Sequence, residues 1–266
     1  MRIAYYIKKT ELASDRRIAS LIARLEEAGM ELYNIGEGLR ESTAMLLSFG
    51  GDGTFLSAAH LVCSASVPVL GVNLGRLGFL SDAELDEVAQ ALIAGEWKVE
   101  ERTMIQLQVG EKRLFAINEV ALRRIASGTL GIDVILGRDA LPTYWADGLL
   151  VSTSTGSTAY CLSAGGPICT PDLNAFIIAP IAPHNLNLRP LVVPQDALIT
   201  ISAHDRKNRS VVLSVDNSDF EIPADVPVRL CCAPFPLRRV VTGQSSSFIG
   251  ALRSKLFWGE DVRNTH

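Results

Sequence analysis

The stretch Gly50-Gly51-Asp52-Gly53-Thr54 sets an acid inside a glycine turn, and both parts of this pattern suit phosphoryl chemistry. An apolar run, 46–49, precedes the turn, and a helical pattern, 54–62, follows it. Backbone N–H groups in such a turn can approach an anion closely, and the helix dipole adds to the attraction. The turn therefore predicts a di- or triphosphate site, although it lacks the lysine of a Walker P-loop and does not match GxGxxG.

Asp52 allows two interpretations. A carboxylate beside bound phosphates is repelled unless it binds Mg²⁺ or accepts the proton of an attacking hydroxyl, and both roles indicate phosphoryl transfer. The alternative is an ordinary strand-to-helix turn in which Asp52 is the N-cap residue. This stretch alone leaves both interpretations open.

Two further segments carry polar groups at element ends. The segment 146–168 is rich in Ser, Thr and Gly, so it could line a polar ligand pocket or form a solvated loop. Asp147 at its start could equally be a turn residue. Asn118 and Glu119 end an apolar strand, where they could contact an adenine edge and a ribose hydroxyl or simply close the strand.

The elements that must position these groups differ between the two parts of the chain. Apolar strand patterns at 2–7, 31–35, 44–49 and 67–73 alternate with helical patterns at 14–30, 54–62 and 81–95, which predicts a parallel sheet covered by helices. After Gly95, short apolar runs joined by turns indicate antiparallel sheets, and the tail 247–261 can form a short amphipathic helix. We expect an α/β, Rossmann-like N-terminal domain and an all-β, sandwich-like C-terminal domain.

Composition excludes some functions. The net charge of −4 and pI near 5.6 provide no general attraction to nucleic acid. The N-terminus lacks a signal-peptide core, and no apolar run is long enough to span a membrane, so we expect a cytoplasmic protein with no membrane partner. Five cysteines without a CxxC pair predict reduced, mostly buried thiols.

In the order of its motifs the chain resembles the NAD kinase family. The resemblance lies in GGDGT (50–54), GVNLGRLGFL (71–80), NE (118–119), DGLLVSTSTGSTAY (147–160) with SAGGPI, and PIAPHNLNLRPLVVP (180–194). GGDGT alone also fits lipid kinases, and a nucleotide-binding regulator without turnover is a second alternative. The resemblance implies phosphorylation of the 2′-hydroxyl of NAD's adenosine ribose, with ATP or polyphosphate as donor and Mg²⁺ or another divalent metal as cofactor.

The resemblance also implies a role for each matching residue. Asp52 would polarise or deprotonate the hydroxyl, Asn118 would contact adenine, Glu119 a ribose hydroxyl, and Asp147 the nicotinamide end. The other implied binding residues are Gly51, Gly53 and Thr54 at the phosphates, Phe79, Thr155, Thr158, Ala159 and Tyr160 around the adenosine, Ala182 near the nicotinamide, and Asn217. No residue is assigned as a protein ligand to a metal.

Two departures from the family pattern accompany these assignments. Ser154 stands where proline is usual, which we expect to loosen the loop, and Asn217 and Ser218 replace part of an Asp-Gly-Gln-like turn. The resemblance implies that 242–266 returns to the N-terminal domain, so the predicted domains are 1–97 with 242–266, and 98–241. It also implies a homodimer or homotetramer.

Overall fold

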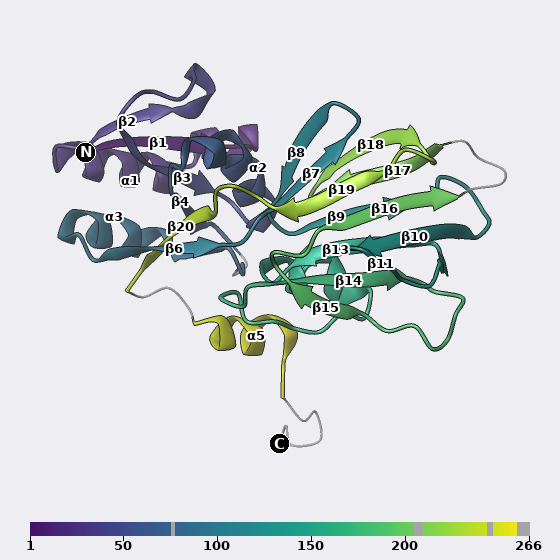
Figure 1. The fold of residues 1–266 in the computed structure, drawn as a ribbon. Helices are drawn as coiled ribbons and strands as arrows, with labels where there is room; N and C mark the ends of the chain where they lie inside the picture. Colours follow the sequence, from purple (N-terminus) through teal and green to yellow (C-terminus); the bar gives the residue numbers. More distant parts are fainter. Residues whose placement is uncertain (76–77, 205–209, 244–246, 260–266) are drawn as a thin grey trace. The chain divides into compact units, whose positions relative to one another are not determined.

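The computed structural model describes residues 1–75, 78–204, 210–243 and 247–259 (Figure 1). The chain forms two compact units, Met1–Glu101 with Leu237–His266, and Arg102–Pro236. The first unit is α/β and the second is built from antiparallel sheets, so the predicted fold class is confirmed. The domain limits predicted from the sequence stay a prediction.

A seven-stranded sheet organises the first unit. Its order is β2 (Glu31–Asn34), β1 (Arg2–Ile7), β3 (Thr43–Phe49), β4 (Val69–Asn73), β20 (Leu237–Thr242) and β6 (Trp97–Arg102), with β5 (Ser81–Glu84) paired to β4. Strands β1, β3 and β4 are neighbours and run parallel. Their carboxyl ends therefore meet at one edge of the sheet, where ligands bind in open α/β sheets.

Helices cover both faces of this sheet. Residues Ile18, Leu21 and Leu25 of α1 (Arg16–Glu27) share a core with the apolar face of α3 (Leu85–Ala94) and with alternate residues of β3. The intervening residues of β3 point to the other face, on which α2 (Asp52–Val62) packs. Asp15 caps α1 by accepting a hydrogen bond from the backbone N–H of Arg17.

The helix predicted at 81–95 is wrong in its first turn, because Ser81–Glu84 forms strand β5 and α3 begins at Leu85. Strand β5 pairs in parallel with β4, and its Ser81 and Asp82 side chains are buried. Asp82 forms an ion pair with the buried Arg239 of β20, which is distant in the sequence. The tertiary partner therefore overrides the local capping pattern.

The second unit is a sandwich of two antiparallel sheets around one apolar core. The seven-stranded sheet consists of β11 (Asp139–Ala140), β10 (Leu130–Leu136), β16 (Ile199–His204), β19 (Val228–Cys232), β7 (Ile105–Val109) and β8 (Lys112–Ala116), with β12 (Tyr144–Ala146) paired to β10. The six-stranded sheet runs β15 (Leu191–Pro194), β14 (Ala175–Ile181), β13 (Gly148–Thr153), β9 (Glu119–Arg123), β17 (Ser210–Val215) and β18 (Ser218–Pro223).

Short helical segments complete the chain. They are η1 (Thr10–Ser14), η2 (Ile35–Glu37), η3 (Cys63–Ala65), η4 (Thr155–Thr158), α4 (Tyr160–Ser163) and α5 (Phe248–Leu256). Cys161 and Cys169 pack in a small buried cluster with Leu150 and Ile177 of the six-stranded sheet. All five cysteines are free thiols. None of the helices in the described ranges is long and apolar enough to cross a membrane.

Candidate active site

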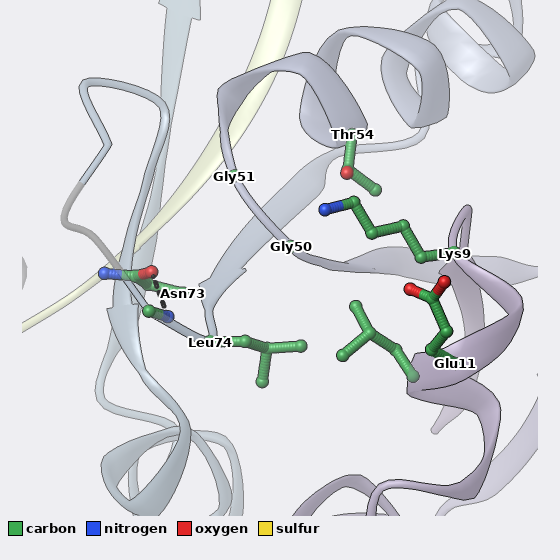
Figure 2. A pocket seen from close by; sticks show the side chains of 9 residues that line it. Lys9, Glu11, Gly50, Gly51, Thr54, Asn73 and Leu74 are labelled. Atoms are coloured by element: carbon green, nitrogen blue, oxygen red, sulfur yellow. Dashed lines mark hydrogen bonds between the residues drawn. The ribbon is translucent and has the colours of Figure 1, made fainter.

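A cavity of about 380 Å³ lies at the carboxyl ends of β1, β3 and β4 in the first unit. Figure 2 shows the glycine turn at its edge, where Gly51 is the N-cap of α2 and Thr54 lies in the first turn of that helix. The first N–H groups of a helix have no partner within it, and the helix dipole makes this end partly positive. The lining residues are Lys9, Glu11, Leu12, Gly50, Gly51, Thr54, Asn73, Leu74 and Gly75.

Lys9 supplies the cation that the glycine motif lacks. It follows β1, and its side chain extends toward Gly50 and Thr54, with the Glu11 carboxylate beside its stem (Figure 2). Because β1 and β3 are adjacent parallel strands, the turns that follow them come together at the sheet edge. The sequence pattern did not single out Lys9, whose only signal was its position two residues after an apolar strand.

The Asp52 carboxylate is held by the backbone that precedes β5. Its Oδ1 accepts hydrogen bonds from the N–H groups of Leu80 and Ser81, each at 3.0 Å, and its Oδ2 accepts one from Phe79 at 2.9 Å. Gly51 is the N-cap of α2, and no side chain caps that helix. The N-cap interpretation of Asp52 is therefore wrong, because the carboxylate points toward a different segment of the chain.

Gly78 lets this segment approach the acid so closely. A Cβ atom built on Gly78 would lie 2.0 Å from Asp52 Oδ1 and 2.8 Å from the backbone oxygen of Ser81. Both values are below any real Cβ contact, so only glycine allows this arrangement without a shift.

A second cation, Lys255, lies next to the Asp52 carboxylate. The Nζ atom of Lys255, on α5, is 3.4 Å from Asp52 Oδ2 and 4.4 Å from the centre of the Phe79 ring. Phe79 also contacts Phe248 of α5, with ring centres 6.1 Å apart. The structure thus surrounds the predicted catalytic acid with donors, and nothing in the local sequence indicated Lys255.

In the second unit, Asn118 and Glu119 are fixed by Asp216 in the turn between β17 and β18. The Asp216 carboxylate accepts hydrogen bonds from the N–H groups of Ile117, Asn118 and Glu119 at 2.8 to 3.1 Å. The Asp216 N–H donates to the Glu119 carbonyl at 3.0 Å. The predicted residue Asn217 is next to Asp216 in this turn, so the structure brings it close to the Asn-Glu pair.

Glu119 and Thr155 carry the polar atoms that indicate a ligand here. Glu119 is 8% exposed, and its Oε2 atom and the Thr155 Oγ1 atom are buried without a hydrogen-bond partner among the residues that the structure describes. Burial, with a smaller contribution from the Asp216 carboxylate, raises the pKa of Glu119 to about 8. A protonated carboxyl group can donate a hydrogen bond, and buried groups without partners need one.

The segment 154–160 is not the solvated loop that was the alternative, because Ser154, Gly156 and Ser157 are buried. A Cβ atom on Gly156 would lie 2.2 Å from the Asn118 carbonyl, so glycine is required for this close approach. The Ser154 hydroxyl donates to the Leu173 carbonyl at 2.5 Å, which ties the loop down. The expectation that Ser154 loosens the loop relative to the usual proline stays a prediction.

Two predicted residues lie elsewhere in the second unit. Asp147 directly precedes β13, whose other end leads into η4, so about 20 Å of strand separates it from Ser154. Arg124 holds Asp147 with two hydrogen bonds of 2.8 and 2.9 Å, and these hold the pKa of Asp147 below its usual range. Ala182 lies near Asp147, because the Asp147 N–H donates to the Ile181 carbonyl, and Ala182 has a positive φ of 47°.

The predicted residues therefore form three groups. The first unit brings together Gly51, Asp52, Gly53, Thr54 and Phe79; the second unit brings together Asn118, Glu119, Thr155, Thr158, Ala159, Tyr160 and Asn217, and separately Asp147 and Ala182. Within the described ranges, no group of three or more His, Cys, Asp or Glu side chains could hold a metal ion.

Comparisons with known proteins identify the family. Models of the ATP-NAD kinase N-terminal and C-terminal domains match residues 9–95 and 117–242. The chain is similar to the NAD kinase of Porphyromonas gingivalis strain W83, with 37% identity over 98% of this chain and 99% of that protein. It is also similar to the NAD kinase of Flavobacterium johnsoniae, with 40% identity over 91% of this chain and 85% of that protein.

Two solved structures share the fold. A crystal structure of an NAD kinase from Archaeoglobus fulgidus in complex with ATP superposes with a TM-score of 0.76, at 27% identity over 92% of this chain and 95% of that one. A crystal structure of yeast NADH kinase complexed with NADH reaches 0.86, at 24% identity over 100% of this chain and 90% of that one. The family models and the full-length relatives show that this chain belongs to the ATP-NAD kinase family.

Proposed function

We propose that this chain transfers the γ-phosphoryl group of ATP to the 2′-hydroxyl of the adenosine ribose of NAD, giving NADP and ADP. The bond from the γ-phosphorus to the bridging oxygen breaks, and a bond from this phosphorus to the 2′-oxygen forms. The hydroxyl proton is released. The observation that carries this proposal is the cavity at the start of α2, where Lys9 and the glycine turn converge.

The donor phosphates would bind at this cavity. Gly51, Gly53 and Thr54 offer backbone N–H groups and a hydroxyl at the helix N-terminus, and Lys9 supplies a positive charge. The ATP in the related Archaeoglobus fulgidus structure supports ATP as donor. Polyphosphate remains an alternative donor.

Mg²⁺ would accompany the donor. This ion keeps most of its ligands as water and phosphate oxygens, so it needs few protein ligands. The Glu11 carboxylate and the Thr54 hydroxyl line the cavity and fit this need. Asp52 fits poorly, because both of its oxygens already accept backbone N–H groups.

The acceptor would bind through the second unit. The partnerless Oε2 of Glu119 and Oγ1 of Thr155 support a ribose-binding role, next to the adenine contact proposed for Asn118. Within the second unit, Thr158, Ala159, Tyr160 and Asn217 would complete the adenosine pocket, while Asp147 and Ala182 would contact the nicotinamide end. Phe79, in the first unit, is the remaining adenosine contact that the family resemblance implies. The NADH in the yeast structure belongs to a chain of the same fold.

Asp52 would orient and polarise the 2′-hydroxyl through Oδ2. Three backbone N–H groups fix the orientation of its carboxylate. Phosphoryl transfer through a loose transition state requires little prior deprotonation of the attacking hydroxyl, so positioning and charge dominate the rate.

The test is NADP formation from NAD, ATP and Mg²⁺, followed with an NADP-specific dehydrogenase, with polyphosphate and NADH as substitutions. We expect Asp52→Asn to lower turnover by about 10²-fold or more. Asp86→Asn is the matched control, because Asp86 is an exposed acid in the first turn of α3. An unchanged chain that forms no NADP with any donor would refute the function, and normal turnover in Asp52→Asn would refute the role of Asp52.

Assembly and location stay predictions. A homodimer or homotetramer is testable by light scattering, and the cytoplasmic location by fractionation of the cells that make the protein.

A further inference from the structure

The C-terminal helix brings a lysine onto the acid of the glycine turn. Ser247 caps α5 by accepting a hydrogen bond from Gly250 N–H, and Leu252 is buried. Near the end of this helix, Lys255 Nζ lies 3.4 Å from Asp52 Oδ2. The ammonium also lies 4.4 Å from the centre of the Phe79 ring, a favourable cation–π distance.

The hydrogen bonds of Asp52 show what Lys255 covers. Each carboxylate oxygen has about two lone-pair sites. Leu80 and Ser81 use both sites of Oδ1, and Phe79 uses one of Oδ2. Lys255 faces Oδ2, the oxygen that retains an acceptor site. The ammonium group therefore lies beside the oxygen through which Asp52 would contact the 2′-hydroxyl.

Charge explains why a cation is needed there. Gly51 and Thr54, which flank Asp52 in the chain, line the donor cavity. A polyphosphate donor in that cavity would be repelled by an uncompensated carboxylate, and the repulsion is substantial where solvent is partly excluded. The side chains of Lys255 and Asp52 are 27% and 31% exposed, so water screens this pair only in part.

We propose that Lys255 is a positioning residue that compensates the charge of Asp52, so that a polyphosphate donor can bind beside the acid. This inference rests on the kinase function proposed above. Lys255 acts through Asp52, so its contribution to ATP binding disappears when the Asp52 carboxylate is removed. A lysine that contacted the donor phosphates directly would contribute equally to ATP binding with and without that carboxylate.

A double-mutant cycle on ATP affinity separates these two behaviours. Calorimetric titration with Mg²⁺ and ATP, without NAD, gives the dissociation constant for the unchanged chain, Lys255→Met, Asp52→Asn and the double variant. We expect Lys255→Met to weaken ATP binding about tenfold, or about 1.4 kcal/mol, when Asp52 is present. In the Asp52→Asn background the same change should weaken binding less than twofold.

Further variants serve as controls. Lys255→Arg keeps the charge and should bind ATP within about threefold of the unchanged chain. Arg253→Met removes an exposed cation from the same helix and should leave the affinity unchanged. Thermal melting verifies folding, and Lys255→Gln replaces Lys255→Met if the latter does not fold.

Equal weakening in both backgrounds, or no weakening in either, overturns the proposal. So does a loss of affinity in Lys255→Arg as large as in Lys255→Met. The kinase function has its own test, because NADP formation by the unchanged chain is measured separately. An unchanged chain that forms NADP but shows no coupling between Lys255 and Asp52, or no ATP binding, would refute this inference alone, and one that forms no NADP with any donor would refute the kinase function.

Discussion

Replacing Gly78 by alanine should displace the acid without touching a substrate. The added Cβ would lie 2.0 Å from Asp52 Oδ1 and 2.8 Å from the Ser81 carbonyl oxygen. The carbonyl belongs to a buried strand and accepts the Gly78 N–H, so the carboxylate is the group that must move. Its movement breaks the hydrogen bonds from Leu80 and Ser81 to Oδ1.

The two costs can be estimated from typical values. Overpacking a tight site costs about 1–3 kcal/mol, and a hydrogen bond to a charged group contributes about 1.5–3 kcal/mol. Because the carboxylate is partly exposed and water replaces some of the lost bonds, we expect a net loss of about 2 kcal/mol. In a chain of this size that corresponds to a melting temperature lower by roughly 5 °C. A displacement of about 1 Å at the acid should lower turnover by about 10²-fold.

Gly75→Ala is the matched control for stability, and the unchanged chain is the reference for turnover because Gly75 lines the donor cavity. Gly75 lies in the same connection between β4 and β5, and a Cβ built on it has no neighbour within 4 Å among the described residues. Turnover is measured in the coupled NADP assay and stability by calorimetric melting. A Gly78→Ala variant with turnover within threefold of the unchanged chain and a melting temperature equal to that of Gly75→Ala would refute this account of how Asp52 is held.

Three other predictions follow from the site and its support. Lys9→Met should raise the KM for ATP about tenfold with little change in turnover, because Lys9 lines the donor cavity. Initial rates at varied ATP measure this KM, and a KM equal to that of the exposed-site control Lys112→Met would contradict the prediction. The folded chain holds the proton of Glu119 up to about pH 8, whereas the unfolded chain releases it near the ordinary pKa of 4.5, so the free energy of unfolding should fall as pH rises through that interval. In urea titrations from pH 6 to 8.5, the free energy of unfolding should fall less for Glu119→Gln than for the unchanged chain. If the free energies of the two proteins change with pH in parallel, Glu119 is not protonated in the folded chain. Arg239→Met leaves the buried Asp82 without its ion-pair partner and should destabilise the chain by about 3–5 kcal/mol in urea, with part of the loss recovered by adding Asp82→Asn.

The sequence by itself predicted the elements whose signals are local. The apolar run 44–49, the glycine turn and the helix after it were all predictable, because a strand, a turn and a helix each depend on residues within a few positions of one another. The antiparallel texture after Gly95 also predicted the β-rich unit. The family motifs added the reaction and the names of the site residues.

What surrounds those residues was decided by the tertiary structure alone. Lys255 lies 203 positions from Asp52 in the sequence, and Asp216 lies 97 to 99 positions from the backbone that it holds. No local pattern records such pairs, because strand order and the return of the C-terminal segment determine them. The same reason explains β5. Its sequence has a helix-capping pattern, but in the fold its backbone pairs with β4 and its Asp82 side chain pairs with Arg239. The sequence thus shows which groups can do chemistry, and the fold selects the charges and hydrogen bonds that control them, because contacts between distant residues depend on topology.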